Sequence, residues 1–265
     1  MSEATRDDQE YSNRAQGAPS LNRRQFLAGG VSLLAMGASS ALFDAQAEEP
    51  TDVRDPMRVP GALPRPYGER ASFEKQTRLI STTSSTTPLQ DLQGIITPSG
   101  LHFERHHNGV PAINPTRHRL LIHGLVGHPL FFTIEELMRL PSASRIAFVE
   151  CSGNSRDGWG EARDATVQGL HGLMSTSEWT GVKLSTLLDA VHAQREATWM
   201  LAEGSDAAAL ARSVPLTDEV LNEAMVCYGQ NGEAIRPEQG YPLRLLLPGF
   251  EGNINVKWLR RLKLG

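Results

Sequence analysis

The sequence predicts a mixed α+β domain, and three observations lead to this prediction. Hydrophobic residues make up 40% and charged residues 21% of the 265-residue chain, which is the composition of a folded globular protein. Short β-like runs are mixed with short helical patterns over the second half of the chain. The spacing of the predicted strands is irregular, which argues against a regular doubly wound parallel sheet. The formal net charge of -4 gives no indication of nucleic-acid binding.

The N-terminal residues 1–47 have the pattern of an export signal. The twin arginines Arg23 and Arg24 precede an uncharged stretch from Phe26 to Phe43, and residues 45–47 form a small-x-small cleavage site. Glycines and serines dilute the stretch, which disfavours the alternative of a membrane anchor. We therefore expect a twin-arginine signal peptide, export of the folded protein to the periplasm, and a mature form without a membrane segment.

Residues 48–95 are expected to form an extended lead-in to the folded domain. Proline recurs along this segment, and the run from Ser81 to Thr87 contains only serine and threonine. Such a composition leaves little that can pack as a core. The folded domain is therefore expected to span residues 96–265.

The first elements of this domain are predicted to be a strand, a helix and a strand. Residues 117–126 form a β-like run. Thr133 and Glu136 have the spacing of a capping box, which begins a helix that Pro141 ends. Residues 145–150 predict a second strand, so that Cys151 stands at the C-terminal end of a strand.

The later elements follow from similar patterns. Leucines at 184, 187 and 188 and the valine at 191 form a helical stripe. Residues 198–201 predict a strand, residues 218–224 a helix, and residues 225–228 a strand that ends before the tight turn Asn231-Gly232. Alternation at 243, 245 and 247, and again at 256, 258, 260 and 262, predicts two C-terminal strands.

Cys151 is the first candidate for chemistry. It stands between Glu150 and a glycine-containing turn, and the nearby Arg156 would favour the thiolate, which is the metal-binding and nucleophilic form of cysteine. From the residues alone three interpretations are open. Cys151 could be a metal ligand, the nucleophile of a hydrolase with a histidine base, or one half of a disulfide with Cys227 in an exported protein.

Three further segments contain candidate site residues. Six of the eight histidines fall between His102 and His128, a density that is compatible with a zinc or copper site, although the chain has no His-Glu-x-x-His pattern. Trp179 opens a second segment, where a core tryptophan is the alternative. The third segment, residues 249–258, is rich in glycine and contains Lys257, which could hold a phosphate group together with backbone amides.

In this order and spacing, the four segments resemble the molybdopterin-binding domain of the sulfite oxidase family over roughly residues 96–265. The chain is most similar to the periplasmic sulfite and sulfane dehydrogenases, whose Phe-x-x-x-His-x-x-x-Pro segment corresponds to Phe103 through Pro111. The resemblance implies a mixed-sheet α+β fold and a molybdenum–molybdopterin cofactor. Family members continue past the position of Gly265 into an immunoglobulin-like dimerisation domain, so we expect a C-terminally truncated form without that domain.

The resemblance also implies roles for individual residues. Cys151 matches the cysteine that ligates molybdenum. Arg105, Arg156 and Trp179 match positions that line the oxyanion pocket, and with Cys151 they are the expected catalytic residues. His107 matches the histidine that contacts the pterin. The expected contacts of the cofactor's phosphate end are Asn253, Asn255, Val256 and Lys257. His106 stands where many relatives have asparagine.

The activity implied by the resemblance is the oxidation of sulfite or of a protein-bound, sulfane-type sulfur. The electrons are expected to pass to a separate c-type cytochrome, because the chain has no Cys-x-x-Cys-His haem motif. Two alternatives stay open beside this activity. The chain could be a non-catalytic, cofactor-binding remnant of the family, or a hydrolase with Cys151 as nucleophile.

Overall fold

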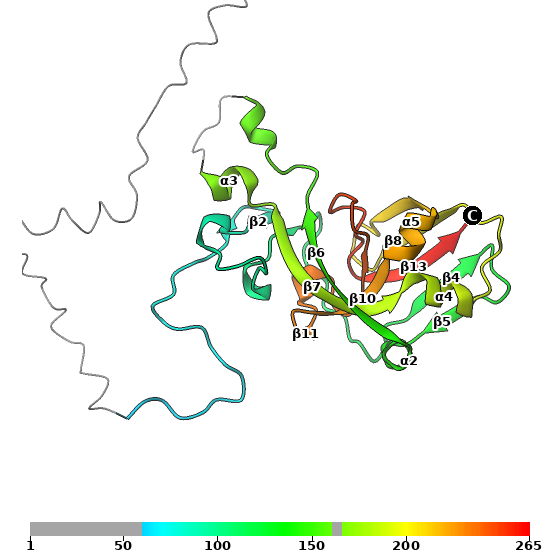
Figure 1. The fold of residues 1–265 in the computed structure, drawn as a ribbon, viewed down its shortest axis with the longest axis horizontal. Coiled ribbons are helices and arrows are strands. Elements are labelled where there is room, and N and C mark those ends of the chain that lie inside the picture. The colour runs from blue at the N-terminus through cyan, green and yellow to red at the C-terminus, as the bar shows by residue number, and fades with distance from the viewer. Residues whose placement is uncertain (1–59, 161–165) are drawn as a thin grey trace, which may run out of the picture. The chain divides into compact units, whose positions relative to one another are not determined.

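The computed structural model describes residues 60–160 and 166–265 (Figure 1). The chain divides after Gly68, and the elements below all belong to the second unit, Glu69–Gly265. The expected signal peptide over residues 1–47 lies outside the described residues. In the part of the chain that the structure describes, no helix is both long and apolar enough to cross a membrane.

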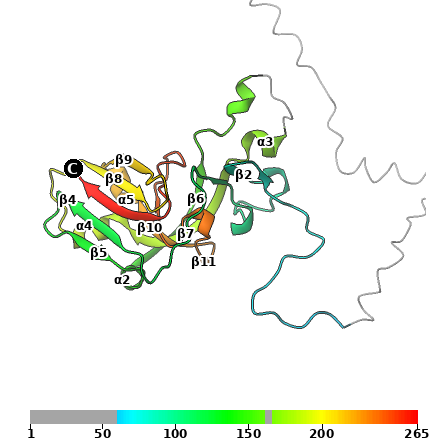
Figure 2. The same cartoon turned by 180° about the vertical axis from the view of Figure 1, so that it is seen from behind.

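A mixed five-stranded sheet forms one side of the second unit, with the strand order β5-β4-β13-β8-β9 (Figures 1 and 2). Its central pair, β4 and β13, is parallel, and the other neighbours are antiparallel. The predicted strands near residues 117–126 and 198–201 are therefore confirmed. The bounds are Leu120–Gly124 for β4, Leu130–Phe132 for β5, Trp199–Gly204 for β8, Ala211–Pro215 for β9 and Leu259–Leu264 for β13.

A second sheet of five strands is entirely antiparallel. The long strands β6 and β7 pair along their whole length, and β7 pairs on its other side with β10. Two short strands, β11 and β12, both pair with the far side of β10. Asn231 and Gly232 connect β10 to β11 with φ angles of 52° and 78°, which confirms the predicted tight turn. The bounds are Ser142–Glu150 for β6, Met174–Lys183 for β7, Met225–Gln230 for β10, Glu233–Ala234 for β11 and Arg244–Leu246 for β12.

A small antiparallel sheet joins the expected lead-in to the domain. It consists of β1 (Leu79–Ile80), β2 (Ser84–Thr86) and β3 (Glu104–Arg105). The expectation that little of this segment can pack is wrong here, because Ser85 and Thr87 are buried. Hydrogen bonds make this burial possible: Thr87 Oγ1 lies 2.6 Å from Ser175 Oγ, and Ser85 Oγ donates to the carboxylate of Glu104.

The helices are short, as predicted. The capping box is present, since the Glu136 amide donates to Thr133 Oγ1 at 3.0 Å and the Thr133 amide donates to Glu136 Oε2 at 2.8 Å. The α-helices of the described residues are α2 (Ile134–Arg139), α3 (Val167–His171), α4 (Leu184–Ala190) and α5 (Asp218–Glu223). The 3-10 turns are η1 (Leu89–Asp91), η2 (Ser99–Leu101), η3 (Arg156–Trp159) and η4 (Pro237–Gln239).

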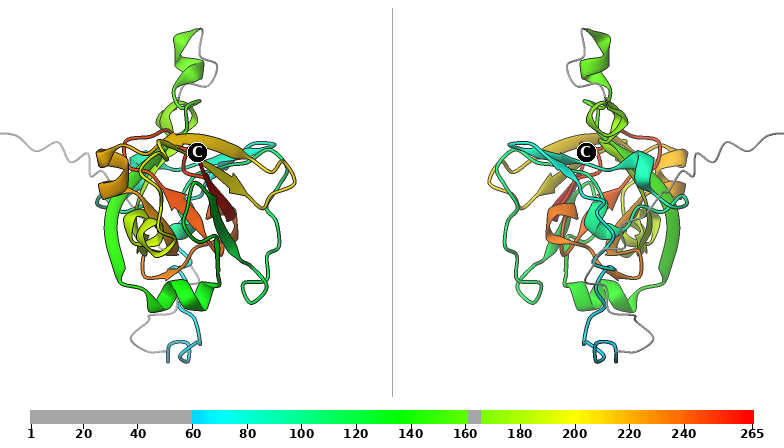
Figure 3. Two further views of the ribbon diagram at one scale, coloured as in Figure 1. Left: turned by 90° about the vertical axis from the view of Figure 1, so that its right-hand side faces the viewer. Right: turned by 90° about the vertical axis from the view of Figure 1, so that its left-hand side faces the viewer.

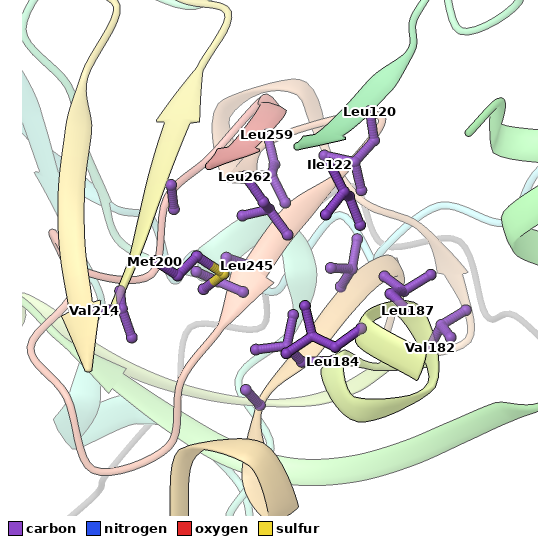
Figure 4. Close-up of a cluster of buried hydrophobic side chains, with 14 of the residues drawn as sticks. Leu120, Ile122, Val182, Leu184, Leu187, Met200, Val214, Leu245, Leu259 and Leu262 are labelled. Carbon is purple, nitrogen blue, oxygen red and sulfur yellow. The ribbon is translucent and has the colours of Figure 1, made fainter. Parts of the chain in front are cut away.

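The main core lies between the mixed sheet and α4 (Figure 4). In both views of Figure 3, α4 lies between the long β6–β7 ribbon and the strands β4 and β13. The predicted helical stripe is buried, and it packs with the leucines at 243, 245 and 247 on one face of β12. The other face of β12 carries Leu246, which joins a second, smaller core that contains Trp179 and Cys227. The strand β12 is therefore buried on both faces.

The start of β13 differs from its prediction. The strand begins at Leu259, and Leu259, Leu262 and Leu264 are the residues that face the main core. Trp258 has a left-handed φ of 53°, and the pairing with β8 shifts register between Leu259 and Arg261. This irregularity breaks the alternation that was expected over residues 256–262. Lys257 therefore lies in the loop that precedes β13, and not in a strand.

Candidate functional site

One cavity brings together segments that are far apart in the sequence. Its lining comes from residues 102–107, from Val149 and Cys151 at the end of β6, from Asp206 and Leu210 between β8 and β9, and from residues between 239 and 258. Six of the nine predicted site residues line this cavity. They are Arg105, His107, Cys151, Asn253, Asn255 and Lys257.

Cys151 follows the last residue of β6, as predicted, and it is only partly buried. Its backbone amide donates to the carbonyl of Leu173, and the amide of Gly153 donates to its Sγ at 3.4 Å. Gly252 lies directly against this segment, because a Cβ there would come within 3.0 Å of the Glu150 carbonyl oxygen and 3.3 Å of Cys151 Cα. The packing of Gly252 thus holds the thiol at the cavity wall.

The disulfide interpretation does not hold in this structure, because Cys151 and Cys227 are both free thiols. Cys227 is fully buried in the second core. Burial raises the pKa of the Cys227 thiol to about 12, which makes it an inert core residue. Cys151 is the thiol that a ligand in the cavity can reach.

Lys257 carries a poorly compensated positive charge. Its Nζ donates to the backbone carbonyls of Arg105 at 3.1 Å and Glu238 at 2.9 Å. Burial, with the nearby charge of Arg244 as a second cause, lowers the pKa of Lys257 to about 7. An anion bound beside Lys257 would reverse this effect.

Arg244 is a second buried cation on the cavity wall. Its guanidinium lies 4.5 Å from the centroid of the Trp179 ring and donates to the carbonyls of Gln239 at 3.1 Å and Asn255 at 3.3 Å. Burial lowers the pKa of Arg244 to about 10. No carboxylate of the described residues forms an ion pair with Arg244 or Lys257. The cavity therefore fits an anionic group, which would supply the missing negative charge.

The glycine-rich loop is organised by two asparagines. Asn255 is buried, and its side chain accepts from the Leu247 amide at 2.7 Å and donates to the carbonyls of Phe250 and Glu251. Its amide group is therefore committed to the loop. Asn253 accepts from Arg212 Nε at 2.5 Å and donates to the Glu251 carboxylate at 2.6 Å. Side chains thus fix the loop backbone that faces the cavity.

Val256 does not line the cavity. Its side chain is buried in the main core, so any contact with a ligand must come from its backbone. The backbone amide of Val256 already donates to the carbonyl of Ile254 at 2.9 Å. Val256 therefore anchors the loop to the main core next to Lys257.

The structure does not place two other predicted residues in the cavity, and these are corrections. Trp179 is 0% exposed in the second core, and its Nε1 donates to the Ala147 carbonyl at 3.3 Å, so the alternative of a core tryptophan describes it better. The Arg156 side chain in η3 is 83% exposed and lies 3.5 Å from Asp157. Because this turn leaves the end of β6, the Arg156 side chain extends into solvent, and it is not part of the lining.

The histidines of the histidine-rich segment differ in burial. His102 is fully buried, and burial lowers its pKa to about 3, so its ring is neutral. His106 is partly buried beside Glu104, and His107 is exposed. The Arg105 guanidinium donates to the His106 carbonyl at 2.6 Å. No group of three or more His, Cys, Asp or Glu side chains in residues 60–160 and 166–265 could hold a metal ion.

Sequence reasoning did not identify several lining residues, of which Arg244 is the most informative. The sequence did contain an indication of its role, because Arg244 is the one charged residue in the apolar run 243–247. A charge at such a position is either exposed at the edge of the strand or buried for a functional reason. His102 and Gln239 gave no comparable signal. Both are buried, and Gln239 donates to the Phe103 carbonyl at 2.6 Å, a contact between distant segments.

Comparison with known proteins places these observations in a family. Residues 107–265, more than half of the chain, match the model of the oxidoreductase molybdopterin binding domain. The chain is 30% identical over 187 residues to an NADH nitrate reductase of Ulva prolifera and 33% identical over 201 residues to an NADPH nitrate reductase of Phytophthora infestans. These alignments cover 64% and 68% of this chain and 21% of each relative, so the chain spans about a fifth of their length.

A solved structure is similar over more of its length. The sulfane dehydrogenase SoxCD from Paracoccus pantotrophus matches with a TM-score of 0.76 and 39% sequence identity, over 81% of this chain and 58% of that chain. The likeness confirms the predicted mixed-sheet α+β fold.

Proposed function

Because this chain belongs to the family of oxidoreductase molybdopterin-binding domains, we propose that it oxidises a small sulfur oxyanion or a protein-bound sulfane sulfur. The cofactor of this family is a molybdenum–pterin. One observation supports the assignment to this cavity: a free thiol and two cations without an ion-pair partner among the described residues, Cys151, Arg244 and Lys257, line the same space. The 39% identity to a sulfane dehydrogenase supports a sulfur substrate.

The residues present fit the molybdenum–pterin group. Cys151 would be its protein ligand, because a thiolate suits a soft metal. Lys257 and Arg244 would balance the negative charge of its phosphate end, and His107 would contact the pterin. When bound, the group supplies two-electron exchange and oxygen transfer, whereas the protein supplies binding, orientation and electrostatics.

Arg105 is the residue we assign to the substrate oxyanion. Its side chain lines the cavity together with Cys151, and its backbone is fixed by Lys257 Nζ at 3.1 Å. The planar guanidinium matches the oxygens of an oxyanion in a bidentate manner. Trp179 contributes indirectly, because it packs beneath Arg244 and holds that cation in place.

A separate c-type cytochrome is the proposed electron acceptor, and the periplasm is the proposed location. The twin-arginine pattern at Arg23 and Arg24 supports the location, and the similarity to a sulfane dehydrogenase supports a separate redox partner. The name SoxCD belongs to a sulfane dehydrogenase, which is consistent with a sulfur-oxidising role.

Nitrate reduction is the second candidate, because the relatives named above are nitrate reductases. A cationic cavity beside a thiol also suits a planar nitrate anion. The two candidates differ in the direction of electron flow. Sulfur oxidation delivers electrons to an acceptor, whereas nitrate reduction requires an electron donor.

The test uses the full chain purified from a host that assembles the cofactor. Sulfite or thiosulfate is added with oxidised cytochrome c, and nitrate is added in parallel with reduced viologen. The proposal predicts sulfur-dependent reduction of the cytochrome and no nitrate-dependent oxidation of viologen. Nitrate turnover alone would support the second candidate. Bound molybdenum without turnover of any substrate would support the non-catalytic alternative.

A further inference from the structure

We propose that His106, oriented by Glu104, is the group that takes up a proton released in this cavity when water supplies an oxygen atom to the substrate. The inference rests on the proposed function, and it adds a residue that the cofactor and substrate contacts do not use. Both side chains line the same cavity as Cys151 and Arg105.

Glu104 holds the histidine ring through one carboxylate oxygen. His106 Nε2 lies 3.1 Å from Glu104 Oε2. The other oxygen, Oε1, lies 2.9 Å from Arg78 Nη1 and accepts from Ser85 Oγ at 3.1 Å. The side chains of His106, Glu104 and Arg78 are only 16% to 22% exposed. The carboxylate is therefore fixed on both sides, and it cannot turn away from the histidine without losing these partners.

This arrangement determines which ring nitrogen can accept a proton. An ionised carboxylate only accepts hydrogen bonds, so His106 Nε2 must be the nitrogen that carries the hydrogen. In the neutral ring Nδ1 is then an unprotonated acceptor. Among the described residues no hydrogen bond occupies Nδ1, since the ring contact of His106 is the one to Glu104. A carboxylate that holds one imidazole nitrogen and leaves the other free is the arrangement of a general base.

Charges of both signs surround the pair. The Arg105 guanidinium donates to the His106 carbonyl, and Lys257 Nζ donates to the Arg105 carbonyl, so both basic side chains are hydrogen-bonded to the backbone of this segment. Glu104 is the group that contacts the ring itself. The groups that face this pair are Arg78, Arg105, His107, Glu238 and Lys257, with Glu238 lying 3.6 Å from Arg78. Removal of the Glu104 carboxylate should therefore release the His106 ring from its fixed orientation.

The proposed reaction needs such an acceptor. Oxidation of sulfite by water gives sulfate, two protons and two electrons, and the electrons leave one at a time to the cytochrome-class acceptor. His106 Nδ1 receives the first proton, and the charge of the resulting imidazolium is balanced by Glu104. The second proton passes to solvent.

The test compares His106→Asn and Glu104→Gln with the full wild-type chain loaded with molybdenum. His192→Asn is the matched control, because His192 lies outside the cavity lining and has a φ of 52°, which asparagine also tolerates. Sulfite-dependent reduction of cytochrome c is measured between about pH 5 and 9. We expect the acid limb of the kcat profile to disappear in His106→Asn, with a loss of about 100-fold in kcat at the optimum.

Glu104→Gln should lower kcat, because a glutamine amide can donate as well as accept and no longer holds the ring in one tautomer. His192→Asn should match wild type. An acid limb that persists in His106→Asn, with kcat within about threefold of wild type, would overturn the proposal. A wild-type chain that binds molybdenum but turns over neither sulfite nor thiosulfate would overturn the proposed function, and the proton role with it.

Nitrogen NMR of the histidine rings in cofactor-free protein gives a readout that does not depend on activity. The signal of His106 should show protonated Nε2 and bare Nδ1 in the neutral ring of wild type. Glu104→Gln should shift this tautomer equilibrium. An unchanged His106 signal in Glu104→Gln would contradict the positioning role of Glu104.

Discussion

Lys257 should give the cofactor-free protein a pH dependence that a single substitution removes. The pKa of Lys257 is lowered from 10.5 to about 7 in the folded chain, mainly by burial. Between these values the unfolded chain holds a proton that the folded chain has released. The free energy of unfolding should therefore rise with pH from about 7 to about 10.5, and below pH 7 the full cost of burying the charge should be present.

The expected magnitude follows from the same two values. Between pH 7 and about pH 9.5 the linkage relation gives ~3 kcal/mol for this group. Because the Lys257 side chain is partly exposed, solvent screening reduces the expected effect to ~2 kcal/mol. Lys257→Met removes the titrating group and keeps a side chain of similar length. Its loss of two hydrogen bonds lowers stability equally at both pH values, so it does not affect the difference.

Urea unfolding of cofactor-free wild type and Lys257→Met at the two pH values measures this difference. Wild type should gain about 2 kcal/mol relative to the variant between pH 7 and pH 9.5. Saturating inorganic phosphate should stabilise wild type more at the lower pH, because it binds the charged form. Parallel pH dependences of the two proteins would refute the claim that the charge of Lys257 is largely buried and poorly compensated in the empty cavity.

Three further predictions concern the site and its supports. Trp179→Phe should lower the free energy of unfolding by about 1–3 kcal/mol and leave the KM for sulfite unchanged, because the indole lies in the second core. A large change in KM with normal stability would show instead that Trp179 contacts the substrate. Gly252→Ala should lower molybdenum retention with a modest loss of stability, because its Cβ would meet the backbone beside Cys151; full retention would show that the loop can shift. Arg105→Ala should weaken substrate binding by roughly 2–5 kcal/mol in steady-state kinetics, whereas Arg156→Ala should not; equal effects would contradict the placement of Arg156 in solvent.

Local patterns predicted the elements that depend on neighbours in sequence. The capping box at Thr133 and Glu136, the buried stripe of α4 and the Asn231-Gly232 turn all depend on short-range geometry, and all are present. The start of β13 was missed because the left-handed conformation of Trp258 follows from tertiary packing and is not a preference of tryptophan. The burial of Ser85 and Thr87 was missed because their hydrogen-bond partners come from distant strands.

The site residues also fall into two groups, those that local sequence predicts and those that depend on tertiary packing. Residues in loops next to strand ends, such as Cys151 and Lys257, could be identified from their local segments and from the family resemblance. The side of a strand that Trp179 occupies depends on the register of β7 with its neighbours, which the sequence does not reveal. The role of Arg244 depends on β12 being buried on both faces, which only the arrangement of the two cores makes evident.

We predict that this cavity binds a molybdenum–pterin through Cys151. The most direct measurement is the molybdenum-to-protein ratio, by elemental mass spectrometry, of wild type, Cys151→Ser and Cys227→Ala purified from a host that assembles the cofactor. We predict a ratio near one for wild type and for Cys227→Ala, and a ratio near zero for folded Cys151→Ser. A wild-type ratio near zero, or a Cys151→Ser ratio equal to that of wild type, would contradict the claim.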